Sequence, residues 1–132
     1  MSYDIDVTFP GGKKVDAHFG GFTVHTDQEI QYGGEGSAPQ PFDLFFASLA
    51  TCGGYYALQF CLSRGIQTDG LKVRLTAEKN EEKKLLDRIK IYLTLPEGFP
   101  EKYRDAIVRA VDLCTVTRHI RADLNFFIEV IN

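Results

Sequence analysis

The sequence has few cysteines and no excess of basic residues. Its 132 residues include three cysteines, whereas disulfide-stabilised secreted domains use an even and denser set. We therefore expect free thiols in a reducing cytoplasm. With 15 Lys and Arg against 18 Asp and Glu, the formal net charge is −3. This weakly acidic balance argues against binding to nucleic acid or to an anionic membrane surface.

Several motifs are absent as well. Residues 1–9 show no basic stretch followed by an apolar run, so no signal peptide is predicted. No G-x-G-x-x-G, P-loop or G-x-S-x-G motif occurs, which argues against nucleotide binding and serine hydrolysis. Cys52, Cys114 and His119 could in principle hold zinc, but no C-x₂-C or H-x₃-H spacing supports it. We expect neither metal nor cofactor.

The composition is that of a folded, globular chain. At 44% hydrophobic residues the chain can bury a core, and its length suits one domain over 1–132. Apolar and polar residues alternate at the spacing of half-buried strands in six segments. These segments are about 3–9, 15–19, 22–32, 71–77, 89–95 and 126–131, with a Gly-rich flexible loop at 33–37 and a charged hairpin tip at 81–84.

A long apolar helix is predicted at 42–63, between Pro41 and Gly65. It has one charge, Asp43, and its apolar residues surround nearly the whole helix, which is typical of a buried central helix. Its length could suit a membrane span, but its polar residues and the lack of a second span argue against that. A second helix opens at Pro100 and breaks near Cys114, and a short one follows at about 116–123. The predicted order is therefore three strands, a helix, two strands, two helices and a strand.

The first helix carries two cysteines that face opposite ways. Cys52 lies beside Gly53 and Gly54, which allow a neighbouring backbone or a substrate to approach closely. Taken alone, a cysteine on an apolar helix is more often a small buried hydrophobic residue. Cys61 is about half a turn round and about 13 Å further along, so it cannot bridge to Cys52 and is expected to pack in the core.

Cys114 lies at the predicted junction of two helices. Helix N-terminal amides stabilise a thiolate, and Arg118, one turn on, could lie over the sulfur. Cys114 could also be the inner end of an apolar stripe. His119 lies about 140° round from Cys114 and points elsewhere, while His18 and His25 are read as surface side chains. With two such cysteines, one thiolate can attack a peroxide oxygen and become a sulfenic acid, and the other can condense with it to a disulfide. Spacing alone does not show that the two meet.

Two motifs resemble those of the OsmC/Ohr family (osmotically inducible protein C and organic hydroperoxide resistance protein). Residues 38–44 together with 47–52 are similar to its first cysteine motif, and residues 114–119 are similar to its second. The resemblance implies an OsmC-like α+β fold. It also implies an intertwined homodimer in which sheets wrap two central helices.

The resemblance further implies reduction of organic hydroperoxides. Cys52 would attack the peroxide and Cys114 would resolve the product through an intramolecular disulfide. The site would lie in an apolar pocket at the dimer interface, for which Phe45, Phe46 and Tyr56 are the expected lining. A dithiol, in some members a lipoyl group, would reduce the disulfide.

The chain departs from the family pattern in its charges. The family's peroxidases carry a Glu ten residues before the first cysteine, where this chain has Phe42 followed by Asp43. They also carry an N-terminal Arg, whereas no Arg precedes Arg64 here, so Lys13, Lys14, His18 or Arg118 would have to substitute. This difference favours an alternative, a dimer that binds a small hydrophobic molecule without turnover. A third reading is cysteine acyl transfer with His119 as the base.

Overall fold

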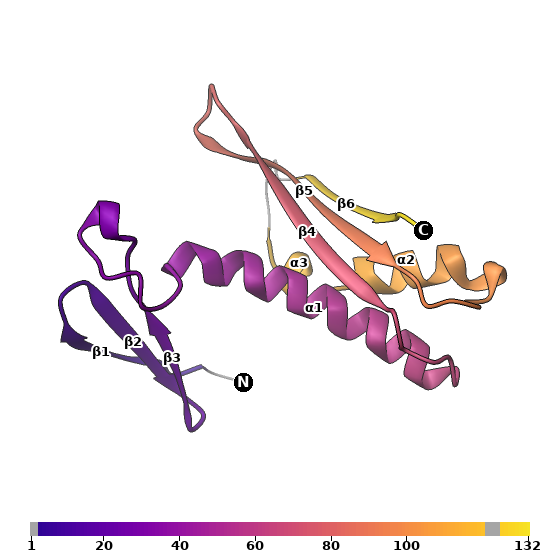
Figure 1. Cartoon of the computed structure of the whole chain (residues 1–132), viewed down its shortest axis with the longest axis horizontal. Coiled ribbons are helices and arrows are strands. Elements are labelled where there is room, and N and C mark those ends of the chain that lie inside the picture. The colour runs from indigo at the N-terminus through magenta and orange to yellow at the C-terminus, as the bar shows by residue number, and fades with distance from the viewer. Residues whose placement is uncertain (1–2, 121–124) are drawn as a thin grey trace. The chain divides into compact units, whose positions relative to one another are not determined.

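The computed structural model describes residues 3–120 and 125–132. These residues divide into two compact units, with the boundary between Phe45 and Phe46. The order of its main elements is the predicted one (Figure 1), so the α+β class is confirmed. Two short 3₁₀ helices, η1 (Ile30–Tyr32) and η2 (Glu101–Tyr103), add to that order.

The first unit is built on an antiparallel sheet of three consecutive strands. They are β1 (Asp6–Gly11), β2 (Lys14–Phe19) and β3 (Phe22–Thr26), in the order β1-β2-β3. The expectation that the third strand continues to about residue 32 is wrong, because β3 ends at Thr26 and residues 30–32 form η1.

Asp27 accounts for the early end of β3. Its carboxylate is 1% exposed and accepts hydrogen bonds from the N–H of Gln28 (2.8 Å), of Glu35 (3.2 Å) and of Ser37 (3.1 Å). The Ser37 hydroxyl donates a fourth at 2.7 Å. The chain therefore turns back at Asp27, and residues of the predicted Gly-rich loop are hydrogen-bonded to the Asp27 carboxylate.

Helix α1 (Pro41–Ser63) begins and ends as the sequence predicts. At its start, the Asp43 carboxylate accepts a hydrogen bond from the Gln40 N–H at 3.0 Å, which satisfies a donor near the helix N-terminus. At its end, Gly65 has a φ of +65°, and the Ile66 N–H donates to the Cys61 carbonyl at 2.9 Å. This left-handed glycine with a bond back into the last turn is the common C-terminal stop of a helix.

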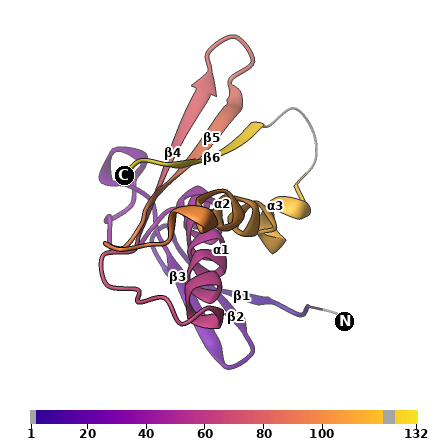
Figure 2. The same cartoon turned by 90° about the vertical axis from the view of Figure 1, so that its right-hand side faces the viewer.

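The second unit sets helices against a mixed sheet. Its elements are α1 from residue 46 onward, β4 (Lys72–Asn80), β5 (Leu85–Thr94), α2 (Arg104–Asp112), α3 (Thr115–Arg118) and β6 (Asn125–Val130). β4 and β5 form the predicted hairpin, and β6 pairs parallel to β5. Figure 2 shows α1 and α2 on the same face of this sheet. α3 ends at Arg118 rather than near residue 123; residues 121–123 of the expected helix lie outside the described part of the chain.

Only one stripe of α1 is fully buried in the single chain. It consists of Leu49, Gly53, Ala57, Phe60 and Cys61. Cys61, at 0% exposure, joins the core with residues of β5 and α2, which confirms its predicted packing. Other apolar side chains of α1, namely Tyr55, Leu58 and Leu62, are exposed in the single chain. By length and composition α1 could cross a membrane, a test that core helices of soluble proteins also pass.

Candidate functional site

A second stripe of α1 faces α2 and α3. Cys52, Tyr56, Gln59 and Ser63 follow one another at helical spacing, so their side chains leave the same side of the helix. Tyr56, Gln59 and Ser63 line a groove of about 340 Å³ between α1 and α2. Cys52 lies one turn before this groove.

The turn between α2 and α3 places Cys114 against this stripe. α2 ends at Asp112 and α3 begins at Thr115, so Cys114 is the N-terminal cap residue of α3. Its N–H donates to the Val111 carbonyl at 3.1 Å, and its carbonyl accepts from the Arg118 N–H at 3.0 Å. Both of its backbone groups are thus used in the turn, and its side chain is 1% exposed.

The structure brings the two cysteines of the predicted pair together. Both are free thiols, Cys52 half-buried and Cys114 buried. The two side chains interact directly, and their interaction raises the pKa of Cys52 and lowers that of Cys114. Two residues that are far apart in the sequence therefore form one dithiol.

The two thiols differ in how well they can hold a negative charge. Burial is the largest influence on Cys52 and raises its pKa, which the N–H groups of Val116 and Thr115 partly oppose. Burial also opposes charge on Cys114, but the Cys52 thiol and the Thr117 hydroxyl, followed by the N–H groups of Thr117 and Val116, outweigh it and lower the pKa. The N–H groups at the start of α3 thus favour negative charge on the Cys114 sulfur.

Tyr56 links α1 directly to the first residue of α3. Its hydroxyl and that of Thr115 form a hydrogen bond of 2.8 Å. Tyr56 lies four residues after Cys52, and Thr115 directly follows Cys114. Sequence reasoning expected Tyr56 only as part of a pocket lining and did not single out Thr115. The i,i+4 spacing of Cys52 and Tyr56 is the signal that could have suggested a shared site.

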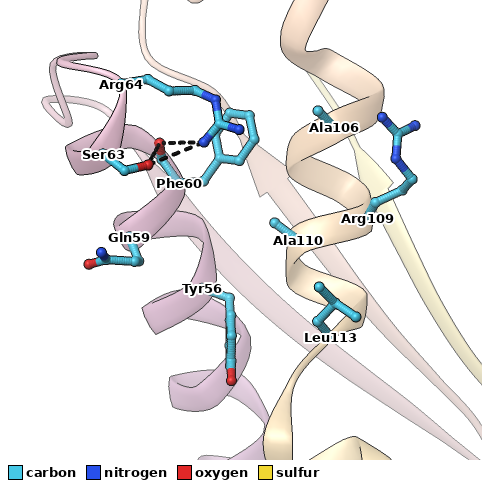
Figure 3. Close-up of a pocket in the computed structure, with 9 residues that line it drawn as sticks. All are labelled: Tyr56, Gln59, Phe60, Ser63, Arg64, Ala106, Arg109, Ala110 and Leu113. Carbon is cyan, nitrogen blue, oxygen red and sulfur yellow. Dashed lines mark hydrogen bonds between the residues drawn. The ribbon is translucent and has the colours of Figure 1, made fainter.

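The groove beyond Tyr56 is mostly apolar with two cationic side chains. Phe60, Ala106, Ala110 and Leu113 line it together with Arg64 and Arg109 (Figure 3). The Arg64 guanidinium lies 3.7 Å from the centre of the Phe60 ring and donates to the Ser63 hydroxyl at 3.2 Å. Sequence reasoning did not single out either arginine.

The remaining predicted site residues have separate settings. Phe45 and Phe46 lie earlier in α1 and are half-buried, and Phe45 stacks on Phe42 at 5.8 Å. Their place in a pocket lining stays a prediction. Arg118 is exposed in the last turn of α3, and its role as a thiolate stabiliser also stays a prediction. His119 Nδ1 donates to the Thr115 carbonyl at 2.7 Å, so this nitrogen is engaged within its own turn.

Two other histidines lie on the sheet of the first unit. The His18 ring bridges Thr8 and Thr23, at 2.8 and 3.1 Å, while His25 pairs with Asp16 at 3.0 Å. Across residues 3–120 and 125–132, no three His, Cys, Asp or Glu side chains gather as a metal site would require.

Comparisons with known proteins agree with this architecture. The family model described as OsmC-like protein matches residues 34–129. A Psychrobacter arcticus protein named for an osmotic stress and detoxification response has a similar structure, with a TM-score of 0.80 and 20% identity over 96% of this chain and 94% of that one. An OsmC-like protein from Mycoplasma pneumoniae gives a TM-score of 0.77 at 16% identity, over 99% of this chain and 96% of that one.

A third similar structure is an organic hydroperoxide resistance protein from Elizabethkingia anophelis. It gives a TM-score of 0.67 at 20% identity and covers 100% of this chain and 98% of that one. No curated protein sequence matches significantly. At these identities, the structural matches establish the fold.

Proposed function

The chain belongs to the OsmC-like protein family, and on that premise we propose that it reduces organic hydroperoxides in defence against oxidative stress. Cys52 is the attacking residue and Cys114 the resolving one. The observation that carries this proposal is the interaction of the two free thiols across 62 positions of sequence. The organic hydroperoxide resistance protein among the similar structures supports the choice of substrate class.

The proposed reaction passes two electrons from the thiol pair to the peroxide. Cys52 gives its proton to the Cys114 thiolate and attacks the terminal peroxide oxygen, so that an S–O bond forms and the O–O bond breaks. The departing alkoxide takes the proton from Cys114. The Cys114 thiolate then attacks the Cys52 sulfenic acid, hydroxide leaves, and a disulfide remains. A dithiol, such as a lipoyl group, returns two electrons by thiol–disulfide exchange.

Backbone dipoles support thiolate formation in this proposal. The family's glutamate position is Phe42 here, and no arginine precedes Arg64. The N–H groups of Thr115 and Val116 stabilise negative charge on Cys52 instead, as amides at a helix start do for other reactive cysteines.

The test is consumption of cumene hydroperoxide with an excess of dithiol. We expect Cys52→Ser to lose turnover, because no other sulfur can take its place in the pair. Cys114→Ser should accumulate a sulfenic acid that dimedone traps. Cys61→Ser is the matched control. This variant should keep wild-type peroxidase activity, because Cys61 is fully buried in the core. Equal rates for the wild-type protein and Cys52→Ser would refute the proposal.

The groove between α1 and α2 supports one alternative. Its volume of about 340 Å³ and its apolar walls could hold a small hydrophobic molecule without turnover. Native mass spectrometry after peroxide treatment separates the two functions. A loss of two hydrogens assigned to a Cys52–Cys114 bridge supports the peroxidase. Unchanged thiols with a co-purified ligand support the binding protein.

A further inference from the structure

We infer that Tyr56 and Thr115 are positioning residues for the dithiol, because their hydrogen bond holds the start of α3 against Cys52. The inference rests on the proposed function for its biological meaning, but it concerns the geometry of the thiol pair itself. The bond measures 2.8 Å and joins residues 59 positions apart in the sequence.

Both partners stand next to the sulfurs that they position. Tyr56 follows Cys52 by four residues, so the two side chains are about 40° apart round the axis of α1. Thr115 is bonded covalently to Cys114 and is the first residue of α3. A hydrogen bond from the Thr115 hydroxyl to α1 therefore limits how far the start of α3 can move away from Cys52.

α3 is too short to hold its own position. It has four residues, and a helix of that length is not stable by itself. Its backbone hydrogen bonds include those from the Arg118 N–H to the Cys114 carbonyl and from the His119 N–H to the Val116 carbonyl, and both stay within the segment. The Tyr56–Thr115 bond instead reaches across to α1, which the core anchors through Ala57 and Phe60.

The position of α3 decides which donors the sulfurs meet. The N–H groups of Thr115 and Val116 act on Cys52, and those of Val116 and Thr117 act on Cys114. If the first turn of α3 moves away from α1, Cys52 loses donors that stabilise its thiolate, and the two sulfurs separate. The hydroxyl pair thus controls both the acidity of the dithiol and the rate at which it closes.

The experiment measures the reduced full-length protein by alkylation with iodoacetamide as a function of pH. Peptide mass spectrometry follows Cys52 and Cys114 separately. In Tyr56→Phe and in Thr115→Val, we expect the first apparent pKa of the pair to rise by about half a unit to one unit. Disulfide formation with diamide should slow by about 3- to 10-fold.

Matched variants separate positioning from a general loss of structure. Thr115→Ser keeps the hydroxyl and should restore the wild-type profile. Tyr55→Phe removes the same hydroxyl from the neighbouring exposed ring and should change nothing. Because both partners serve one bond, the double variant Tyr56→Phe with Thr115→Val should shift no further than either single variant.

Two results would overturn the inference. One is a wild-type pH profile and closing rate in both Tyr56→Phe and Thr115→Val, and the other is an equal shift in Tyr55→Phe. The readout does not depend on peroxide turnover. If the shifts appear in a protein that consumes no hydroperoxide, the positioning role stands and the proposed function fails.

Discussion

At the scale of single residues, the three cysteines differ in the groups around them. Burial raises the pKa of Cys61, with Arg64 opposing it, and its side chain packs among core residues. Cys52 and Cys114 instead meet each other and the N–H groups that open α3. The same side chain is therefore a core residue at one site and half of a dithiol at the other.

The buried carboxylate of Asp27 makes the stability of the fold depend on pH. Hydrogen bonds from Ser37, first from its hydroxyl and then from its N–H, lower the pKa of this carboxyl from 3.8 to about 2, and Gln28 and Glu35 add to the effect. A carboxyl with a depressed folded-state pKa stabilises the fold above its unfolded-state pKa. That stabilisation is lost as the pH falls from about 4 through about 2.

We therefore expect the thermal stability of the wild-type protein to fall in this window more steeply than that of Asp27→Asn. Circular dichroism melts between about pH 6 and pH 2 would measure the difference. Asp69→Asn, at an exposed position, is the control and should follow the wild type. Parallel curves for the wild type and Asp27→Asn would show that the Asp27 carboxylate does not stabilise the fold.

At the scale of elements, α1 has three sides with different uses. One packs on β5 and α2, one carries Cys52 and Tyr56, and one is exposed at Tyr55, Leu58 and Leu62. Because each of these sides carries apolar residues, apolar side chains surround the helix, although only one stripe is fully buried. Gly53 lies on the side that packs in the core, where the side chains of Ile91 and Val111 approach it closely.

The two glycines of α1 are predicted to respond oppositely to added side chains. A Cβ at Gly54 would meet Val73 Cγ2 at 3.9 Å, an ordinary contact, and alanine favours helix over glycine. Gly54→Ala should therefore raise the free energy of unfolding by about 0.5–1 kcal/mol. At Gly53 a Cβ would lie 3.4 Å from both Ile91 Cδ1 and Val111 Cγ1, so a larger side chain has no room.

Gly53→Leu should accordingly lower the free energy of unfolding by about 1–3 kcal/mol through overpacking. Urea denaturation of both variants measures the two effects on one scale. A Gly53→Leu protein as stable as the wild type would mean that α1 does not approach the sheet and α2 as closely as the structure shows.

At the scale of the whole molecule, apolar side chains remain uncovered in each unit. Phe22 of β3 is 70% exposed and Leu62 of α1 is 58% exposed. Covering large apolar side chains with another protein removes their surface from water, which favours association. We propose that this chain forms the homodimer that the family resemblance implies, in which a second copy covers these side chains.

If the protein is a homodimer, sedimentation equilibrium should give a mass twice that of the single chain. Leu58→Asp and Leu62→Asp should shift the protein toward monomer, because a buried unpaired carboxylate is costly in an apolar interface. Gln67→Asp, in an exposed loop, should leave the assembly unchanged. A monomeric wild-type protein at micromolar concentration would exclude the dimer.

The sequence alone determined the features that depend on neighbouring residues. Alternation located the strands, and Pro41 and Gly65 marked the ends of α1, because period and capping are properties of a local stretch of chain. The two cysteine motifs identified the residues that the structure brings together.

Tertiary structure decided what depends on residues far apart. β3 ends at Thr26 because Asp27 accepts bonds from Glu35 and Ser37, which the alternating pattern does not encode. The meeting of Cys52 with Cys114 requires the turn between α2 and α3, and the Tyr56–Thr115 bond requires two helices to pack side by side. Periodicity tells which face of a helix is apolar, but only packing decides what that face meets.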